Sequence, residues 1–151
     1  MVLDAWHQYL KRTDDLFREF TDEDLLKQIA PGKNSGKYLL GHLTAVHDRM
    51  LPLLGVGQTL FPGLHDDFET KPDGGQVKNH STNDLRRQWT EVNTMLNNAI
   101  ATLTFEQWFE KHTAISAEDF SKEPHRNRLN VIINRTNHIA WHYGQLILIK
   151  G

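Results

Sequence analysis

The segment "HIAWHYGQL", residues 138–146, places two histidines four positions apart in a run that is otherwise mostly apolar. In a helix, residues four apart lie on the same face, one turn from each other. Apolar and small residues keep the helical period through this region: Val131, Ile132, Thr136, Ile139, Tyr143, Leu146 and Ile147. The pattern therefore predicts a helix from about residue 126 to the end of the chain, with His138 and His142 on a mostly core-facing side.

The spacing of apolar residues predicts three more long helices. They cover about residues 2–20, about residues 36–54, and the segment from a cap at Ser81 to about residue 103. Residues 55–81 hold prolines, a Gly-Gly pair and mixed charge, so we expect no regular structure there. No segment alternates as a strand would. The prediction is an all-α protein, a single four-helix-bundle domain over residues 1–151, with a long connection between its second and third helices that leaves room for a crossover.

The composition excludes several classes of function. The chain has 151 residues, a formal charge of −2 with histidine neutral, nine histidines and no cysteine. Lysine and arginine are scattered, which argues against binding to nucleic acid. No apolar run suits a membrane span, and the N-terminal segment lacks the apolar core of a signal peptide. Without cysteine the chain fits a reducing compartment, so we expect a cytoplasmic protein with neither nucleic acid nor a membrane as partner.

A second histidine-bearing segment, "YLLGHLTAVHDRM" at residues 38–50, completes a candidate metal site. His42 lies three residues after Leu39 and four before Val46, so it shares the apolar side of its helix and points inward. Together with His138 and His142 it would give three imidazole ligands and one open position, which is typical of catalytic rather than structural zinc. The alternative is a set of hydrogen-bonded core histidines without a metal.

His47 lies five residues after His42, about 140° further round the helix. One metal does not easily take both side chains, so we expect His47 at the rim of the site, as a proton shuttle or a surface histidine. Other metal and nucleotide motifs are absent from the sequence: Glu-x-x-His, His-Glu-x-x-His, the Walker A loop and Gly-x-Ser-x-Gly.

The segments "GHLTAVHDRM" and "NHIAWHYGQL" together resemble the DinB/YfiT-like superfamily, over nearly the whole chain. The resemblance implies a four-helix bundle, frequently a homodimer, with a divalent metal, commonly zinc or nickel, held by His42, His138 and His142. Gly144 and Gln145 match a Gly-Gln pair that often follows the last ligand. In two respects the chain departs from the family pattern. His47, followed by Asp48, stands where an acidic residue is frequent, and Tyr38 fits only loosely the aromatic residue that often precedes the first ligand.

Known activities of this superfamily include transfer reactions of low-molecular-weight thiols. We therefore expect a metal-dependent transferase in which the metal activates such a thiol toward an electrophilic small-molecule substrate. The candidates for second-shell or proton-handling roles are His47, Asp48, Tyr143 and Gln145. Two alternatives stay open: a hydrolase that uses the same metal to activate water, and a non-catalytic bundle that binds a small ligand or a partner.

Overall fold

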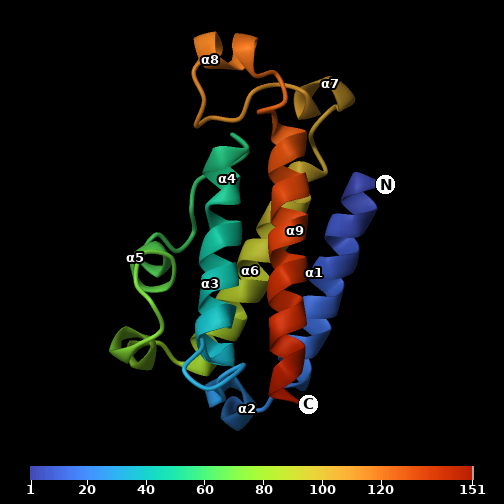
Figure 1. The fold of residues 1–151 in the computed structure, drawn as a ribbon. Helices are drawn as coiled ribbons and strands as arrows, with labels where there is room; N and C mark the ends of the chain where they lie inside the picture. Colours follow the sequence, from blue (N-terminus) through green and yellow to red (C-terminus); the bar gives the residue numbers. More distant parts are fainter. Residues whose placement is uncertain (151) are drawn as a thin grey trace.

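Four long helices lie side by side in the computed structural model, which describes residues 1–150 (Figure 1). They are α1 (Val2–Glu19), α3 (Gly36–Asp48), α6 (Thr82–Ile100) and α9 (Arg128–Leu146). Each turns apolar residues toward the others, as Trp6, Leu43, Leu96 and Ile139 do. No strand occurs in the described part of the chain. The predicted all-α bundle is confirmed.

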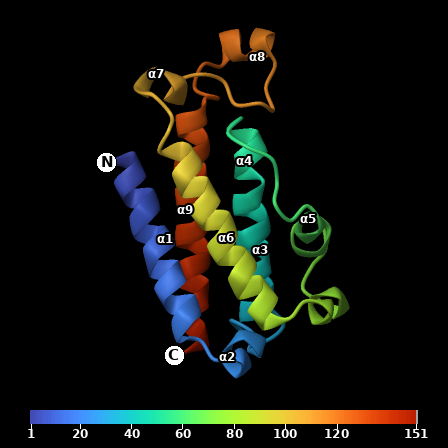
Figure 2. The ribbon, with the colours of Figure 1, turned by 180° about the vertical axis from the view of Figure 1, so that it is seen from behind.

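The four helices do not alternate in direction. α1 and α9 run one way along the bundle and α3 and α6 run the other way, as the front and rear views agree (Figures 1 and 2). Two consecutive helices that run in the same direction need a connection that returns along the bundle. Residues 55–81 make that return, so the long connection predicted between the second and third helices is a crossover. As a result, α3 and α9 are antiparallel neighbours.

Short helices close the ends of the bundle, and side-chain caps fix where they begin. Thr21 and Asp24 form a reciprocal capping box at α2 (Asp22–Leu26). Thr104 and Gln107 do the same at α7 (Phe105–Trp108). The long helices α3, α6 and α9 begin at Ser35, Ser81 and Asn127, whose side chains each accept a backbone N–H hydrogen bond.

The second predicted helix is divided in two. α3 ends at Asp48, and a short helix, α4 (Met50–Leu53), continues beyond Arg49. Gly55, with φ of 69°, then takes the left-handed conformation that ends a helix, which a residue with a side chain adopts only with strain. The predicted limits at residues 36 and 54 are therefore close to those observed.

The expectation that residues 55–81 lack regular structure is wrong. This segment holds α5 (Gly63–Phe68) and a 3₁₀ helix, η1 (Gly75–Asn79). Leu64 and Phe68, four residues apart, are buried against α3, and Val77 is buried in η1. Two buried residues in six are too few to show a helical period, so the sequence pattern did not predict α5.

The segment before α9 also contains a helix that the pattern did not predict, α8 (Ala117–Lys122), which has no buried residue. Beyond α9 the chain continues as η2 (Ile147–Ile149). Across residues 1–150, no helix combines the length and the apolarity that crossing a membrane requires.

Candidate metal centre

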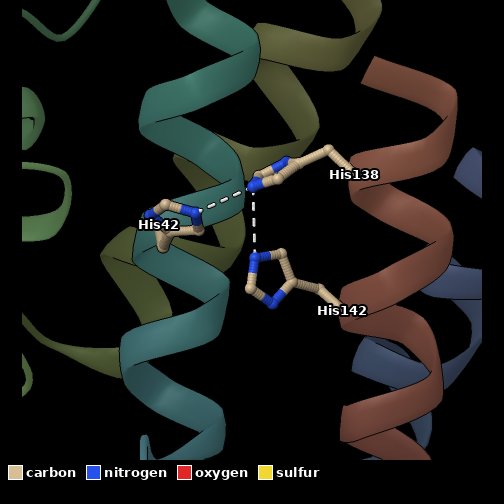
Figure 3. A group of neighbouring side chains, drawn as sticks. All are labelled: His42, His138 and His142. Carbon is tan, nitrogen blue, oxygen red and sulfur yellow. Dashed lines mark hydrogen bonds between the residues drawn. The ribbon is translucent and has the colours of Figure 1, made fainter. Parts of the chain in front are cut away.

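Three imidazole rings meet between α3 and α9, one from α3 and two from α9 (Figure 3). The Nε2 atom of His138 lies 3.2 Å from Nε2 of His42 and 3.1 Å from Nε2 of His142. One ligand atom from each ring falls within 4.8 Å of the other two, and all three residues are half-buried. The structure therefore brings together the three histidines that the sequence selected, at the edge of the core rather than deep inside it.

The meeting of these rings follows from the fold. His138 and His142 are one turn apart on α9, so their rings project from the same side. α3 is the antiparallel neighbour of α9, and His42 projects from it into the space between the two helices (Figure 3).

Two of the rings are oriented by hydrogen bonds from their other nitrogen. His42 donates from Nδ1 to the backbone carbonyl of Phe68 at 2.8 Å, and His142 donates from Nδ1 to Oε1 of Gln145 at 2.7 Å. A carbonyl oxygen only accepts, so in both rings the proton is on Nδ1 and Nε2 carries a lone pair. This second contact is the usual means by which proteins fix the tautomer of a metal-binding histidine.

The proton count of the cluster favours a cation. Because Nε2 of His42 and Nε2 of His142 are both acceptors, only His138 can donate a hydrogen bond within the cluster. Its Nε2–H can donate to only one of the two neighbouring rings at a time. Its Nδ1 is buried and has no hydrogen-bond partner within residues 1–150. Hydrogen bonding among three neutral imidazoles therefore leaves a lone pair of the cluster unmatched, whereas a divalent cation accepts lone pairs from all three. The donor set fits a divalent metal ion.

The protonation states also suit metal binding. Burial, with the nearby charges of His142 and His42, lowers the pKa of His138 to about 3. Burial likewise lowers the pKa of His142 to about 4, against the opposing effect of its hydrogen bond to Gln145. Both imidazoles are neutral at pH 7, which is the form that binds a metal.

Tyr38 completes the support of His42 from within α3. The two rings are stacked, with centroids 6.0 Å apart and 10° between their planes. The Tyr38 hydroxyl donates to the carbonyl of Lys71 at 2.8 Å, which attaches the end of the α5 segment to α3. The aromatic residue that the family resemblance anticipated before the first ligand thus lies directly against it.

Gly41 allows α5 to approach His42 closely. A Cβ atom at this position would lie 2.6 Å from Cζ of Phe68 and closer still to two other ring carbons. Only a glycine leaves room for the Phe68 ring. The backbone carbonyl of Phe68 in turn accepts the hydrogen bond from His42. Sequence reasoning missed both Gly41 and Phe68. The available signal was a glycine inside an apolar helix beside a candidate ligand, which often marks a close approach of another segment.

The predicted position of His47 at the rim is wrong. The residue is completely buried, its ring lies between Trp6 and Trp89 with centroids 5.0 and 5.2 Å away, and its Nδ1 is 2.8 Å from Oδ1 of Asn93. Burial lowers its pKa to about 4. The turn of about 140° from His42 points it toward α1 and α6, because α3 is surrounded by the other helices.

Asp48 and Tyr143 also contact other parts of the fold. The Asp48 carboxylate accepts the backbone N–H groups of Leu60 and Phe61, both at 2.8 Å, and so anchors the start of the crossover. Tyr143 packs edge-on against Tyr9 of α1, with ring centroids 6.4 Å apart. Among the four proton-handling candidates, only Gln145 has a hydrogen bond to one of the three histidines. A catalytic role stays a prediction for all four.

Comparison with known proteins agrees with this geometry. The family model of the DinB superfamily matches residues 5–146, which include His42, His138 and His142. A search of curated proteins finds no match. Because the matched region spans nearly the whole chain and its four long helices, the chain belongs to the DinB superfamily.

Proposed function

We propose that His42, His138 and His142 hold a divalent metal ion, zinc or nickel, and that the protein is a transferase acting through a low-molecular-weight thiol. The observation that carries the proposal is the convergence of three Nε2 atoms, two of them on rings whose Nδ1–H is held by a carbonyl oxygen. Membership of the DinB superfamily supports it.

The chemistry rests on charge. A divalent cation bound by three neutral imidazoles would keep its positive charge and would lower the pKa of a thiol beside it, which is about 8.5 in a free cysteine. The chain has no cysteine, so the thiol comes from a second molecule. The residues of the protein supply orientation: the Phe68 carbonyl and the Gln145 side chain hold two rings in one tautomer, and Tyr38 stacks on His42.

The surroundings favour thiol transfer over hydrolysis. Attack by water benefits from a general base, commonly a carboxylate, whereas a thiolate attacks without one. Within residues 1–150 the histidine group includes no carboxylate. Glu69, next to Phe68 in sequence, is not a member of that group, and its Oε2 accepts from Arg49 at 3.1 Å.

The proposal includes a homodimer in the cytoplasm, where low-molecular-weight thiols are kept reduced. Trp141 is 69% exposed and Leu148 is 60% exposed, both on the side of the C-terminal helical region away from the core. A large exposed tryptophan of this kind is frequent at protein interfaces.

The experiment is elemental analysis of protein purified without a histidine tag or added metal. Wild type is compared with His42→Ala and His138→Ala, and with His7→Ala as the matched control, because His7 is an exposed histidine of α1. We expect about one metal per chain in wild type and control, and a loss of metal in the two site variants. Metal-loaded wild type should then transfer an added thiol to a model electrophile such as a haloalkyl bimane. Equal metal content in all four proteins would refute the proposed centre.

A further inference from the structure

Arg135 is a shielded cation without a partner beside the three histidines. It lies on α9 one turn before His138 and two turns before His142, on the same side of the helix. The residue is half-buried, and its Nε atom is buried without a hydrogen-bond partner in the described chain. No carboxylate oxygen of residues 1–150 lies within 4.0 Å of a guanidinium nitrogen of Arg135, which is the limit for an ion pair.

The other shielded arginines of the protein are all paired. Arg86 donates to the carbonyls of Phe17 and Phe20, the latter at 2.7 Å. Arg128, whose side chain is 16% exposed, lies 2.9 Å from the carboxylate of Glu110. Removing a cation from water without a partner is costly, so the isolation of Arg135 indicates a place for an anion that comes from outside the chain.

The charges near Arg135 do not neutralise it. Arg49 follows His42 by seven residues, two turns along α3, and because α3 and α9 are antiparallel, Arg49 and Arg135 lie at the same end of the histidine cluster. The carboxylate there is that of Glu69, whose Oε2 accepts from Arg49 at 3.1 Å and whose Oε1 is buried without a hydrogen-bond partner among residues 1–150. Two guanidinium groups and one carboxylate leave one positive charge in excess.

Burial lowers the pKa of Arg135, Glu69 opposes this effect, and Arg49 adds to it. All three groups are therefore within electrostatic reach of one another. The guanidinium nevertheless stays charged at neutral pH, as arginine does in proteins.

We infer that Arg135 binds the carboxylate of a small thiol whose sulfur lies at the three histidines, so that the protein selects acidic thiols. The inference rests on the proposed function. Along α9, Arg135 is about 4.5 Å from the level of His138 and about 10.5 Å from the level of His142, from a rise of 1.5 Å per residue. A small thiol whose carboxylate is a few bonds from its sulfur is long enough to reach from the histidines to Arg135. A guanidinium matches a carboxylate with two parallel hydrogen bonds.

The test measures binding rather than turnover, with cobalt(II) as the metal and two thiols of nearly equal shape. 3-Mercaptopropionate carries the carboxylate, and 3-mercaptopropionamide is its neutral analogue. Sulfur-to-cobalt charge-transfer absorption reports the bound thiol and gives the two dissociation constants. We expect wild type to bind the acid about ten- to a hundredfold more tightly than the amide, which is the effect of one charge-assisted pair.

Arg135→Gln should abolish this preference and leave the affinity for the amide within about twofold, since the amide makes no ion pair. Arg135→Lys should keep part of the preference for the acid, because lysine retains the positive charge but lacks the pair of parallel N–H donors of a guanidinium. Arg18→Gln, which removes an arginine paired with Asp14 on α1, is the control and should change nothing. Equal affinities for acid and amide in wild type, or an unchanged preference in Arg135→Gln, would overturn the inference. Failure of wild type to bind cobalt would instead refute the metal centre, and the inference with it.

Discussion

Replacing Gly41 by alanine tests whether the close packing of α5 on α3 keeps His42 in place. The new Cβ would lie 2.6 Å from Cζ of Phe68 and closer to two other carbons of that ring. Nonbonded carbon atoms in contact are about 3.5 Å apart, so the ring must retreat by about 1 Å. Phe68 is completely buried, so we expect the backbone of α5 to move with the ring.

A retreat of about 1 Å would stretch the 2.8 Å contact between His42 Nδ1 and the Phe68 carbonyl to about 3.8 Å, which is no longer a hydrogen bond. Loss of this contact from a metal-binding histidine lowers metal affinity about 10- to 100-fold. Overpacking costs about 1–3 kcal/mol of folding free energy, and replacing a helical glycine regains about 1 kcal/mol. The net destabilisation should therefore be about 0–2 kcal/mol.

The assay is a zinc competition titration against a chromophoric chelator, with urea unfolding of the same proteins. Gly144→Ala is the matched control, because Gly144 also lies on a helix near a candidate ligand, but no atom other than those of its chain neighbours and its own helix backbone is within 4 Å of its added Cβ. It should keep its zinc affinity and gain up to about 1 kcal/mol. Adding Phe68→Leu to Gly41→Ala should restore part of the affinity by making room. Wild-type zinc affinity in Gly41→Ala would refute the reasoning.

Four further predictions follow from the surroundings of the site. The pKa of His47 is about 4 in the folded protein, and an unfolded histidine has a pKa of about 6.5, so the unfolded chain binds more protons between these values. The stabilisation due to neutral His47 should therefore be complete above pH 6.5, and about 3 kcal/mol of the free energy of unfolding should be lost as the pH falls to 4. Urea unfolding of His47→Gln should show a free energy of unfolding that depends less steeply on pH across this range, and an equally steep dependence would contradict the assignment. Gln145→Leu removes the acceptor for His142 and should weaken zinc binding by about 10- to 100-fold in the same competition titration, so an unchanged dissociation constant would count against it. Asp48→Asn should lower the free energy of unfolding by about 1–3 kcal/mol while leaving zinc affinity unchanged, and a selective loss of zinc would instead place Asp48 at the metal. Trp141→Ser should shift the mass measured by light scattering from dimer to monomer at micromolar protein, whereas a wild-type monomer would exclude the dimer.

The long helices could be predicted because each buries a continuous apolar stripe over several turns. The start of α6 was equally visible, since Ser81 is a capping residue and Asp84 follows it at the offset of a capping box. The short helices α5 and α8 were not, because each is six residues long and its apolar residues show no period. An apolar period therefore predicts a helix only where the helix is long enough for the period to repeat.

The candidate site, like the fold, could be predicted from the sequence only in part. Spacing within each helix, together with the family resemblance, indicated that His42, His138 and His142 would meet, and the structure brings them together. The groups around them come from a different source. Phe68 reaches His42 through the packing of the crossover on α3, which no local pattern specifies. The sequence specifies the angle between His47 and His42 but not the neighbours of α3, so it does not reveal that His47 is buried.

Anomalous X-ray scattering from a crystal of the zinc-loaded protein tests the central claim most directly. Data collected on both sides of the zinc absorption edge locate the metal without assumptions about its ligands. The account predicts one strong peak per chain at about 2.0–2.1 Å from Nε2 of His42, His138 and His142. A fully loaded crystal with no peak between α3 and α9, or with its peak on other residues, would contradict the three-histidine centre.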